Sequence, residues 1–213
     1  MKIRLLSILL ILVSCGNQSN NNSTDKTNNN ITETSNIGNL FLGVIDNDTL
    51  LVKAIPVIDD GDTLYESPAI YKGRNVLYQD TSNNLFIINE TKCFMKKVNS
   101  TNYIFLNMFD APFENKWHIV EISNNHVKVY KNILQNIFKD INKDGFCEVG
   151  GRYATDAICL DCDSAFYSPY LIYSLKNELV FDSVLSIKLT EETYGFFLGF
   201  DVVDTILVQQ NNF

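Results

Sequence analysis

The stretch DINKDGFCE, residues 140–148, carries the most specific pattern in this chain. Side chains that bear oxygen stand at every second position of its first half, and Gly145 follows them at once. A hard cation such as calcium takes about six to eight oxygen ligands, and a tight loop can aim alternate side chains at it. The spacing therefore predicts a calcium loop. The predicted ligands are the side-chain oxygens of Asp140, Asn142, Asp144 and Glu148 and the backbone carbonyl of Phe146.

The front half of this loop follows the calcium-binding pattern D-x-[DN]-x-[DN]-G, but the back half departs from an EF-hand. The twelfth position, a bidentate glutamate in EF-hands, is Gly151 here, and an acid stands at the ninth position as Glu148. Glycines at 150 and 151 also disfavour a helix after the loop. Residues 133–138, before the loop, suit either a short helix or a strand. A helix would favour an EF-hand-like entry, and a strand a propeller-like one.

Residues 137–151 resemble the calcium loops of integrin-type FG-GAP repeats and of related bacterial adhesin-like propeller repeats. In that family the loop links two antiparallel strands of a propeller blade. The chain holds no second copy of the pattern, and a propeller needs several blades of about four strands each. The resemblance therefore implies the metal loop rather than a whole propeller. The expected role of the calcium is structural, because metal-binding free energy becomes folding free energy.

Short segments rich in β-branched and aromatic residues recur from residue 39 onward, between Gly, Asn and Asp turns. They are 40–45, 49–55, 75–78, 85–88, 93–98, 103–109, 117–122, 127–130, 147–153, 170–175, 178–181, 196–200 and 205–208. Their spacing predicts a mainly β fold, an antiparallel sandwich or propeller-like fragment with one or two short helices. The clearest helix begins at Asp182 or Ser183, runs through Thr193 and is stopped by Gly195.

The N-terminus has the features of an export signal. Lys2 and Arg4 precede an apolar run at 5–13, which is too short to span a membrane and has the flanks of a signal peptide. The end of this run, LVSC at 12–15, resembles the lipobox of bacterial lipoproteins. That resemblance implies cleavage before Cys15 and acylation of Cys15 with chains such as palmitate, which would anchor the protein to a lipid bilayer. The expected location is the cell envelope, at the outer membrane.

The composition divides the chain into three parts. Residues 1–14 are the predicted lipoprotein signal peptide, 15–38 a disordered tether and 39–213 a single β-rich domain. The tether is dominated by Asn, Ser and Thr and buries too little apolar surface to fold. Five tripeptides resemble the O-glycosylation sequon of Bacteroidota, although Asp-Ser or Asp-Thr also marks ordinary turns before strands. They begin at Asp48, Asp62, Asp163, Asp182 and Asp204.

Four cysteines remain beside Cys15, and in an oxidising compartment they can form two disulfides. They are Cys93, Cys147, Cys159 and Cys162, and the sequence does not choose among the three pairings. Cys159 and Cys162 stand in a C-x-x-C arrangement and are candidates for a disulfide. Two other interpretations are a redox pair, although no thioredoxin-like βαβ pattern surrounds it, and half of a zinc site completed by Cys147 or Cys93.

The sequence contains no nucleophile elbow, zinc-protease helix or phosphate-binding glycine loop. The net charge of −8 disfavours nucleic acid as a partner. We therefore expect a non-enzymatic protein whose domain binds a protein or glycan ligand or serves a structural role. The alternative is an exported hydrolase with an acidic and aromatic pocket around Asp161–Tyr173. Its aromatic residues would be Phe166, Tyr167, Tyr170 and Tyr173, which core packing explains equally.

Overall fold

The computed structural model describes residues 38–60, 62–109, 116–124, 126–153, 164–202 and 204–207, with only the backbone described for 164–166 and 204–207. Within these residues the chain forms three antiparallel sheets and one helix. The elements are β1 (Asn39–Ile45), β2 (Asp48–Asp59), β3 (Asp62–Lys72), β4 (Asn75–Gln79), β5 (Leu85–Ile87), β6 (Phe94–Val98), β7 (Thr101–Phe109), β8 (Lys116–Ser123), β9 (His126–Leu134), β10 (Ile137–Lys139), β11 (Glu148–Gly151), β12 (Ser164–Tyr167), β13 (Leu171–Leu175), β14 (Leu179–Phe181), α1 (Ser183–Tyr194) and β15 (Asp204–Leu207). The predicted mainly β, sandwich-like fold is confirmed.

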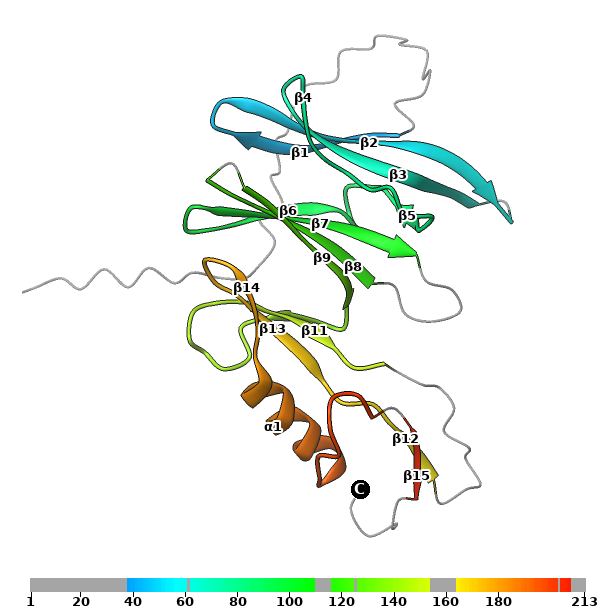
Figure 1. Ribbon diagram of the computed structural model, residues 1–213, viewed down its shortest axis with the longest axis vertical. Helices are drawn as coiled ribbons and strands as arrows, with labels where there is room; N and C mark the ends of the chain where they lie inside the picture. Colours follow the sequence, from blue (N-terminus) through cyan, green and yellow to red (C-terminus); the bar gives the residue numbers. More distant parts are fainter. Residues whose placement is uncertain are drawn as a thin grey trace, which may run out of the picture.

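The strands stack in layers, as Figure 1 shows. The largest sheet runs β1-β2-β3-β5-β7-β8-β9, with β4 beside β3 and β6 beside β7. This sheet passes from an upper to a middle layer at β3, the strand that pairs both with β4 and with β5. The second sheet, β10-β11-β13-β14, forms a lower layer, and α1 lies beneath it. The third sheet pairs β12 with β15.

Strand β7 lies at the centre of this stack and is buried on both faces. Side chains alternate between the faces of a strand, so neighbours along β7 enter different cores. Ile104 and Leu106 pack toward the upper layer in one core, and Tyr103 and Phe105 toward the lower sheet in the other. All four are 0% exposed. The middle layer therefore joins two cores, which explains why residues 103–106 of β7 are apolar on both faces.

Four aromatic rings bind the lower sheet to the middle layer. The Phe105 ring centroid lies 4.6 Å from that of Phe94, 5.2 Å from that of Trp117 and 5.4 Å from that of Phe138. Such pairs contribute roughly 0.5–1.5 kcal/mol each beyond the burial of their area. Phe138 belongs to β10, directly before residue 140. The start of the predicted calcium loop is thus fixed to the core.

The helix begins and ends where the sequence predicts. The Asp182 side chain accepts a hydrogen bond from the Leu185 N–H at 2.9 Å, and Gly195 adopts a left-handed conformation at φ +80°. These are a standard N-cap and C-cap. Two hydroxyls on the inner face of α1 accept backbone N–H groups beside β13, Ser186 from Ile172 and Thr190 from Tyr170. The helix is therefore docked by hydrogen bonds as well as by packing.

Strands β3 and β12 were not predicted from the sequence, and one predicted strand does not form. Within β3, Pro68 has no N–H for a sheet ladder and Ser67 has φ +51°. Both residues lie within β3, which is long enough to pair on either side of them. Residues 196–200 form no strand, although aromatic residues are abundant there. The ring of Phe196 packs on Tyr167, and that of Phe200 packs on Phe181.

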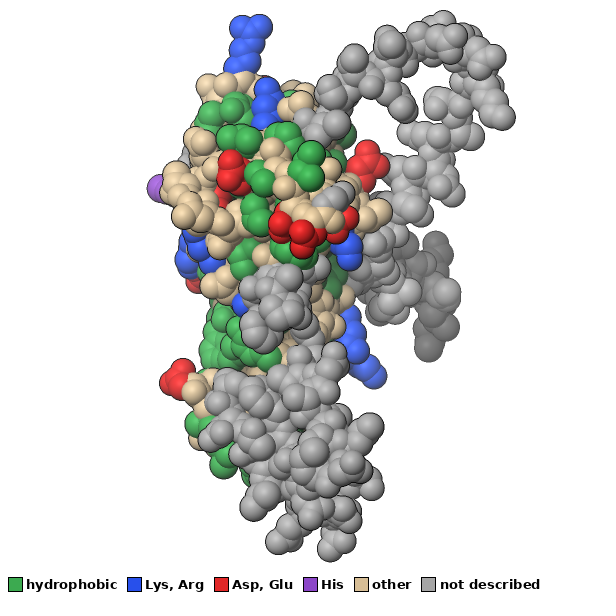
Figure 2. All heavy atoms as spheres, turned by 90° about the vertical axis from the view of Figure 1, so that its right-hand side faces the viewer, with side chains coloured by type: hydrophobic (Ala, Val, Ile, Leu, Met, Phe, Trp, Pro, Cys, Tyr) green, Lys and Arg blue, Asp and Glu red, His purple; other side chains and the backbone are tan. Residues whose placement is uncertain are grey.

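The surface of the upper layer is partly acidic, as the composition suggested. Asp59 and Asp62 are exposed near the turn between β2 and β3, beside the exposed Asp60. Figure 2 shows acidic side chains gathered on this face at the height of that turn. Among the described residues, no helix is long and apolar enough to cross a membrane.

Candidate metal centre

The predicted loop connects two antiparallel neighbours in the lower sheet. Strand β10 pairs with β11 in the register Ile137↔Gly150, Phe138↔Val149 and Lys139↔Glu148. The segment directly before the loop is therefore a strand, and the helical entry of an EF-hand is excluded. Residues 140–147 close this hairpin at the end of the sheet.

Side chains of the loop accept hydrogen bonds from backbone N–H groups further along the chain, which fixes the turns of the loop. Asp140 Oδ2 accepts from the Gly145 N–H at 3.0 Å, and Asn142 Oδ1 accepts from the Asp144 N–H at 2.9 Å. Asp144 Oδ1 accepts from the Phe146 N–H at 2.9 Å. Gly145 has φ +90°, a conformation that costs glycine least. Asp140, Asn142 and Asp144 thus each accept a hydrogen bond from the backbone of the loop itself.

Glu148 lies beneath the loop and is 0% exposed. Its Oε2 accepts the Ile141 N–H at 2.7 Å, and its Oε1 accepts the Ser174 hydroxyl at 3.3 Å. Burial raises the pKa of this carboxyl, and the charges of Asp144 and Asp140 raise it further. The charges of Asp140 and Asp144 therefore disfavour the ionised form of Glu148, which is the electrostatic situation that a cation relieves.

One oxygen of Asp140 has no hydrogen-bond partner within the described part of the chain. Its Oδ1 is buried, while its Oδ2 is occupied by the Gly145 N–H. A buried carboxylate oxygen without a partner is costly, and in native proteins it usually marks a water or an ion. Asp140, the first ligand position of the predicted loop, thus has coordination capacity that the protein itself does not use.

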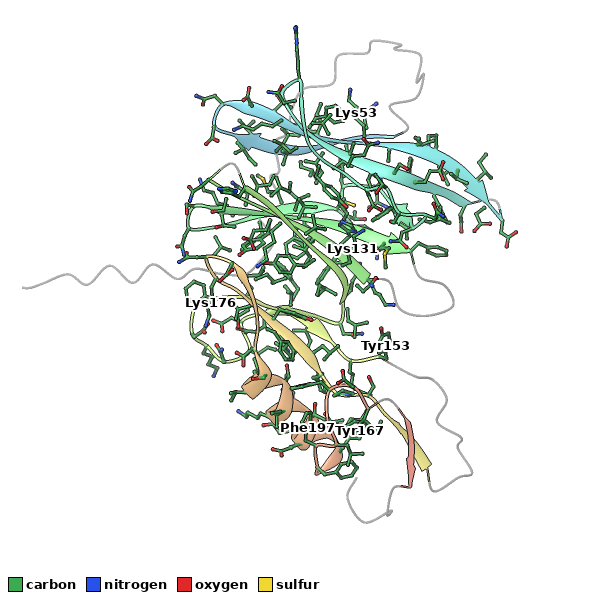
Figure 3. All side chains as sticks on the ribbon, viewed as in Figure 1. Lys53, Lys131, Tyr153, Tyr167, Lys176 and Phe197 are labelled. Atoms are coloured by element: carbon green, nitrogen blue, oxygen red, sulfur yellow. The ribbon has the colours of Figure 1, made fainter. Side chains whose placement is uncertain are left out.

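Asp144 is held by a cation of the protein. Lys176 Nζ lies 3.5 Å from Asp144 Oδ2 and 5.7 Å from the Phe146 ring centroid, at the loop end of the lower sheet (Figure 3). Burial raises the pKa of Asp144, but the Phe146 N–H and the Lys176 ammonium are among the groups that lower it below its usual value. Lys176 therefore competes with a metal ion for this carboxylate.

The donor set fits calcium in its chemistry, because it combines three carboxylates with an amide oxygen and a carbonyl. In the described residues, however, no three His, Cys, Asp or Glu side chains converge closely enough to hold a metal. In this structure Asp144 is engaged instead by Lys176, at 3.5 Å. Gathering all the ligands around an ion requires that pair to open.

A disulfide lies at the end of the loop. Cys147, which directly precedes Glu148, is disulfide-bonded, whereas Cys93 is a buried free thiol that donates to the Ile87 carbonyl. Because Cys93 is free, Cys93 and Cys147 are not bridged to each other. Cys15, Cys159 and Cys162 lie outside the described residues, as do residues 1–37 with the predicted signal peptide and most of the tether. A bridged sulfur is no thiolate, which rules out Cys147 as the zinc ligand considered above.

The aromatic residues of the alternative pocket are only partly within the described chain. Tyr167 is 0% exposed, and its ring packs on Tyr194 at 5.0 Å between centroids. Tyr173 packs on Phe181 at 5.3 Å. The Tyr167 contact is core packing, whereas Tyr173 packs on a Phe181 side chain that is 38% exposed. Asp161, Asp163 and the side chain of Phe166 lie outside the described residues, so a hydrolase pocket there stays a prediction.

Sequence reasoning missed a buried polar network between the upper and middle layers. Tyr78 donates to Asp80 Oδ1 at 3.0 Å, and the Tyr78 hydroxyl oxygen lies 2.6 Å from His118 Nε2. Lys131 donates to the same Asp80 oxygen at 3.1 Å, and Ser82 donates to the other. Asp80 is 1% exposed and His118 0%. No local signal in the sequence connects a histidine on β8 with a tyrosine on β4.

The hydrogen bonds of this network determine the state of His118. Its Nδ1 is buried without a partner in the described structure, so Nδ1 is best left unprotonated and Nε2 carries the hydrogen. His118 then donates to Tyr78, and Tyr78 donates to Asp80. Burial lowers the pKa of His118 to about 4, although the Asp80 charge opposes this. The histidine is therefore neutral near pH 7 and holds two layers together.

The chain was compared with protein-family models, with curated proteins and with solved structures, and none of the three comparisons finds a match. The function is therefore inferred from the residues of the loop and their surroundings.

Proposed function

We propose that this chain is a lipid-anchored protein of the bacterial cell envelope, with a β-domain that calcium stabilises and that serves in binding or as a structural module. The observation that carries the calcium proposal is the fully buried carboxylate of Glu148, which feels the charges of Asp140 and Asp144 beneath one short loop. The anchor is supported by the lipobox-like residues 12–15.

The ion would be held by the side chains of Asp140, Asn142, Asp144 and Glu148 and by the Phe146 carbonyl. Its chemical role is to neutralise carboxylates that otherwise repel one another inside the fold. An ion that binds only the folded chain adds its binding free energy to folding stability. The loop is joined to the aromatic core through Phe138 and to the lower sheet through Glu148, so this stabilisation reaches both layers.

Calcium is expected to raise the melting temperature of the wild-type protein relative to EDTA. With calcium at about a hundred times its dissociation constant, the gain is about 2.7 kcal/mol, or roughly 5–10 °C for a chain of this size. The double variant Asp140→Asn, Asp144→Asn should lose this gain. Asparagine keeps the oxygens that accept the Gly145 and Phe146 N–H groups, so the loop can still wind. Fluorescence of Trp117, the single tryptophan, reports unfolding.

The matched control is Asp59→Asn, Asp62→Asn in the turn between β2 and β3. Both residues are exposed, and the change in net charge is the same. This control should keep the full response to calcium. A wild-type melting temperature that is equal in calcium and in EDTA would contradict the proposed role of the ion.

Removing Lys176 is expected to tighten calcium binding. The variant Lys176→Gln frees Asp144 from its ion pair and removes a positive charge beside the loop. An exposed pair of this kind contributes up to about 1 kcal/mol, so calcium should bind about two- to fivefold more tightly. Isothermal titration with calcium at low salt measures the change. Lys188→Gln on α1, where the lysine pairs with the exposed Glu192, is the control. Weaker calcium binding by Lys176→Gln would show that this lysine supports the site instead.

A further inference from the structure

A second site lies beside the loop. A cleft of about 410 Å³ opens between β10, the end of β11 and α1. Its lining includes Lys139 and Ile141 at the end of β10, Arg152 directly after β11, Tyr170 before β13 and Leu189 on α1. This volume is within the range that small-molecule sites occupy.

Within the described part of the chain, the charged side chains that line this cleft are all cationic. They are Arg152 and Lys139, in a chain whose net charge is −8. Among the described residues neither cation forms an ion pair with an acid. Another cleft, of about 480 Å³, differs because its Lys72 is bound to Asp46 at 2.7 Å. Positive charge left without a counterion in a concave site attracts anions.

Arg152 is also held in a fixed orientation. Its Nη1 donates to the Tyr194 hydroxyl at 3.0 Å, and its guanidinium carbon lies 5.8 Å from the Tyr194 ring centroid and 5.9 Å from that of Tyr170. These contacts use one of the five N–H donors of the guanidinium. The remaining donors form the planar fork that binds a carboxylate or a phosphate through two hydrogen bonds.

We propose that this cleft binds a small ligand through an oxyanion, a carboxylate or a phosphate, with Arg152 as the main contact and Lys139 as the second. Tyr170, Ile141 and Leu189 provide an apolar wall for the uncharged part of the ligand. The inference deepens the proposed binding function and rests on it, but not on the calcium. The two sites are neighbours, since Ile141 lines the cleft while its N–H bonds to Glu148.

The test titrates the full-length chain with two matched pairs of probes, observed by NMR or calorimetry. The pairs are methyl glucuronide with methyl glucoside, and glycerol phosphate with glycerol. The charged member of at least one pair is expected to bind at least about tenfold more tightly than its neutral partner, because a hydrogen bond to a charged group contributes most of the affinity. The pair that shows the difference identifies the oxyanion as carboxylate or phosphate.

Three variants locate the binding. Arg152→Gln should weaken binding of the charged probe about tenfold, and Lys139→Gln about threefold. Lys139 is exposed, so its variant is informative even if loss of the Arg152–tyrosine contacts impairs folding. Lys97→Gln removes an equal charge from the other cleft and should leave the affinity unchanged.

Several results would overturn the inference. The first is that neither charged probe binds, and the second is that charged and neutral probes bind equally well. The third is that Arg152→Gln and Lys139→Gln weaken binding no more than Lys97→Gln does. The calcium melting experiment is independent of these titrations. If calcium raises the melting temperature but no oxyanion binds, the calcium proposal stands and the cleft proposal is wrong. If oxyanions bind through Arg152 but calcium has no effect on the melting temperature, the cleft proposal stands and the calcium proposal is wrong.

Discussion

The variant Gly150→Ala is expected to lose about 3–5 kcal/mol of unfolding free energy, or not to accumulate as a folded protein. Gly150 has φ +134°, and a Cβ atom at this position would lie 2.0 Å from the Leu171 carbonyl oxygen and 3.2 Å from the Ile172 Cα. Those atoms are backbone of β13, so they cannot move aside without opening the β11–β13 pairing. Since Glu148 lies on the same strand, the base of the loop at 140–147 would be displaced as well.

Gly145→Ala separates the two causes of this loss. Gly145 also has a positive φ, +90°, but a Cβ there would meet no atom within 4 Å. Its variant should lose only the cost of the left-handed backbone, about 1–2 kcal/mol. Urea unfolding followed by Trp117 fluorescence measures both variants. If Gly150→Ala were no less stable than Gly145→Ala, the close approach of β11 and β13 would not be a feature of the folded protein.

Acidification from pH 6.5 to pH 4 is expected to remove about 3 kcal/mol of stability through His118 alone. The pKa of this histidine is about 4 in the folded protein and 6.5 in the reference state. The unfolded chain therefore takes up the proton more readily than the folded chain. The contribution of the neutral ring is complete above pH 6.5, falls as the pH decreases toward 4 and has vanished below it.

The variant His118→Gln isolates this contribution from other titrating groups. Glutamine keeps a side-chain amide near the Tyr78 hydroxyl but does not titrate. The difference in unfolding free energy between wild type and His118→Gln should shrink by about 3 kcal/mol between pH 6.5 and pH 4. His126→Gln, at an exposed position of β9, is the control and should keep the wild-type dependence. A pH-independent difference between wild type and His118→Gln would mean that His118 is not held neutral by the fold.

Features encoded by neighbouring residues were predictable. The caps of α1 at Asp182 and Gly195 follow from the preferences of single residues. The spacing of oxygens in residues 140–148 is also local, and the calcium site that it predicts stays a prediction. Strand β3 shows the limit of such local patterns. It contains Pro68, which is unfavourable in a strand, and pairing with β2 and β4 nevertheless stabilises it.

Contacts between distant segments were not predictable. The sequence shows Lys176, His118 and Arg152 only as isolated polar residues. The fold places Lys176 against Asp144 at 3.5 Å, and His118 against a tyrosine 40 residues away. These partners meet because β-strands bring together residues that are far apart along the chain, and the pairing order of the strands is not contained in any local period.

The sequence by itself therefore determined the class of fold and the limits of the helix, because each depends on conformational preferences within a few residues. Only the tertiary structure decided which charges lie near one another: Asp140 and Asp144 near Glu148, Lys176 beside Asp144, and Lys139 with Arg152 at one cleft. Electrostatic interactions depend on distance in space and on burial, and both are set when the layers pack.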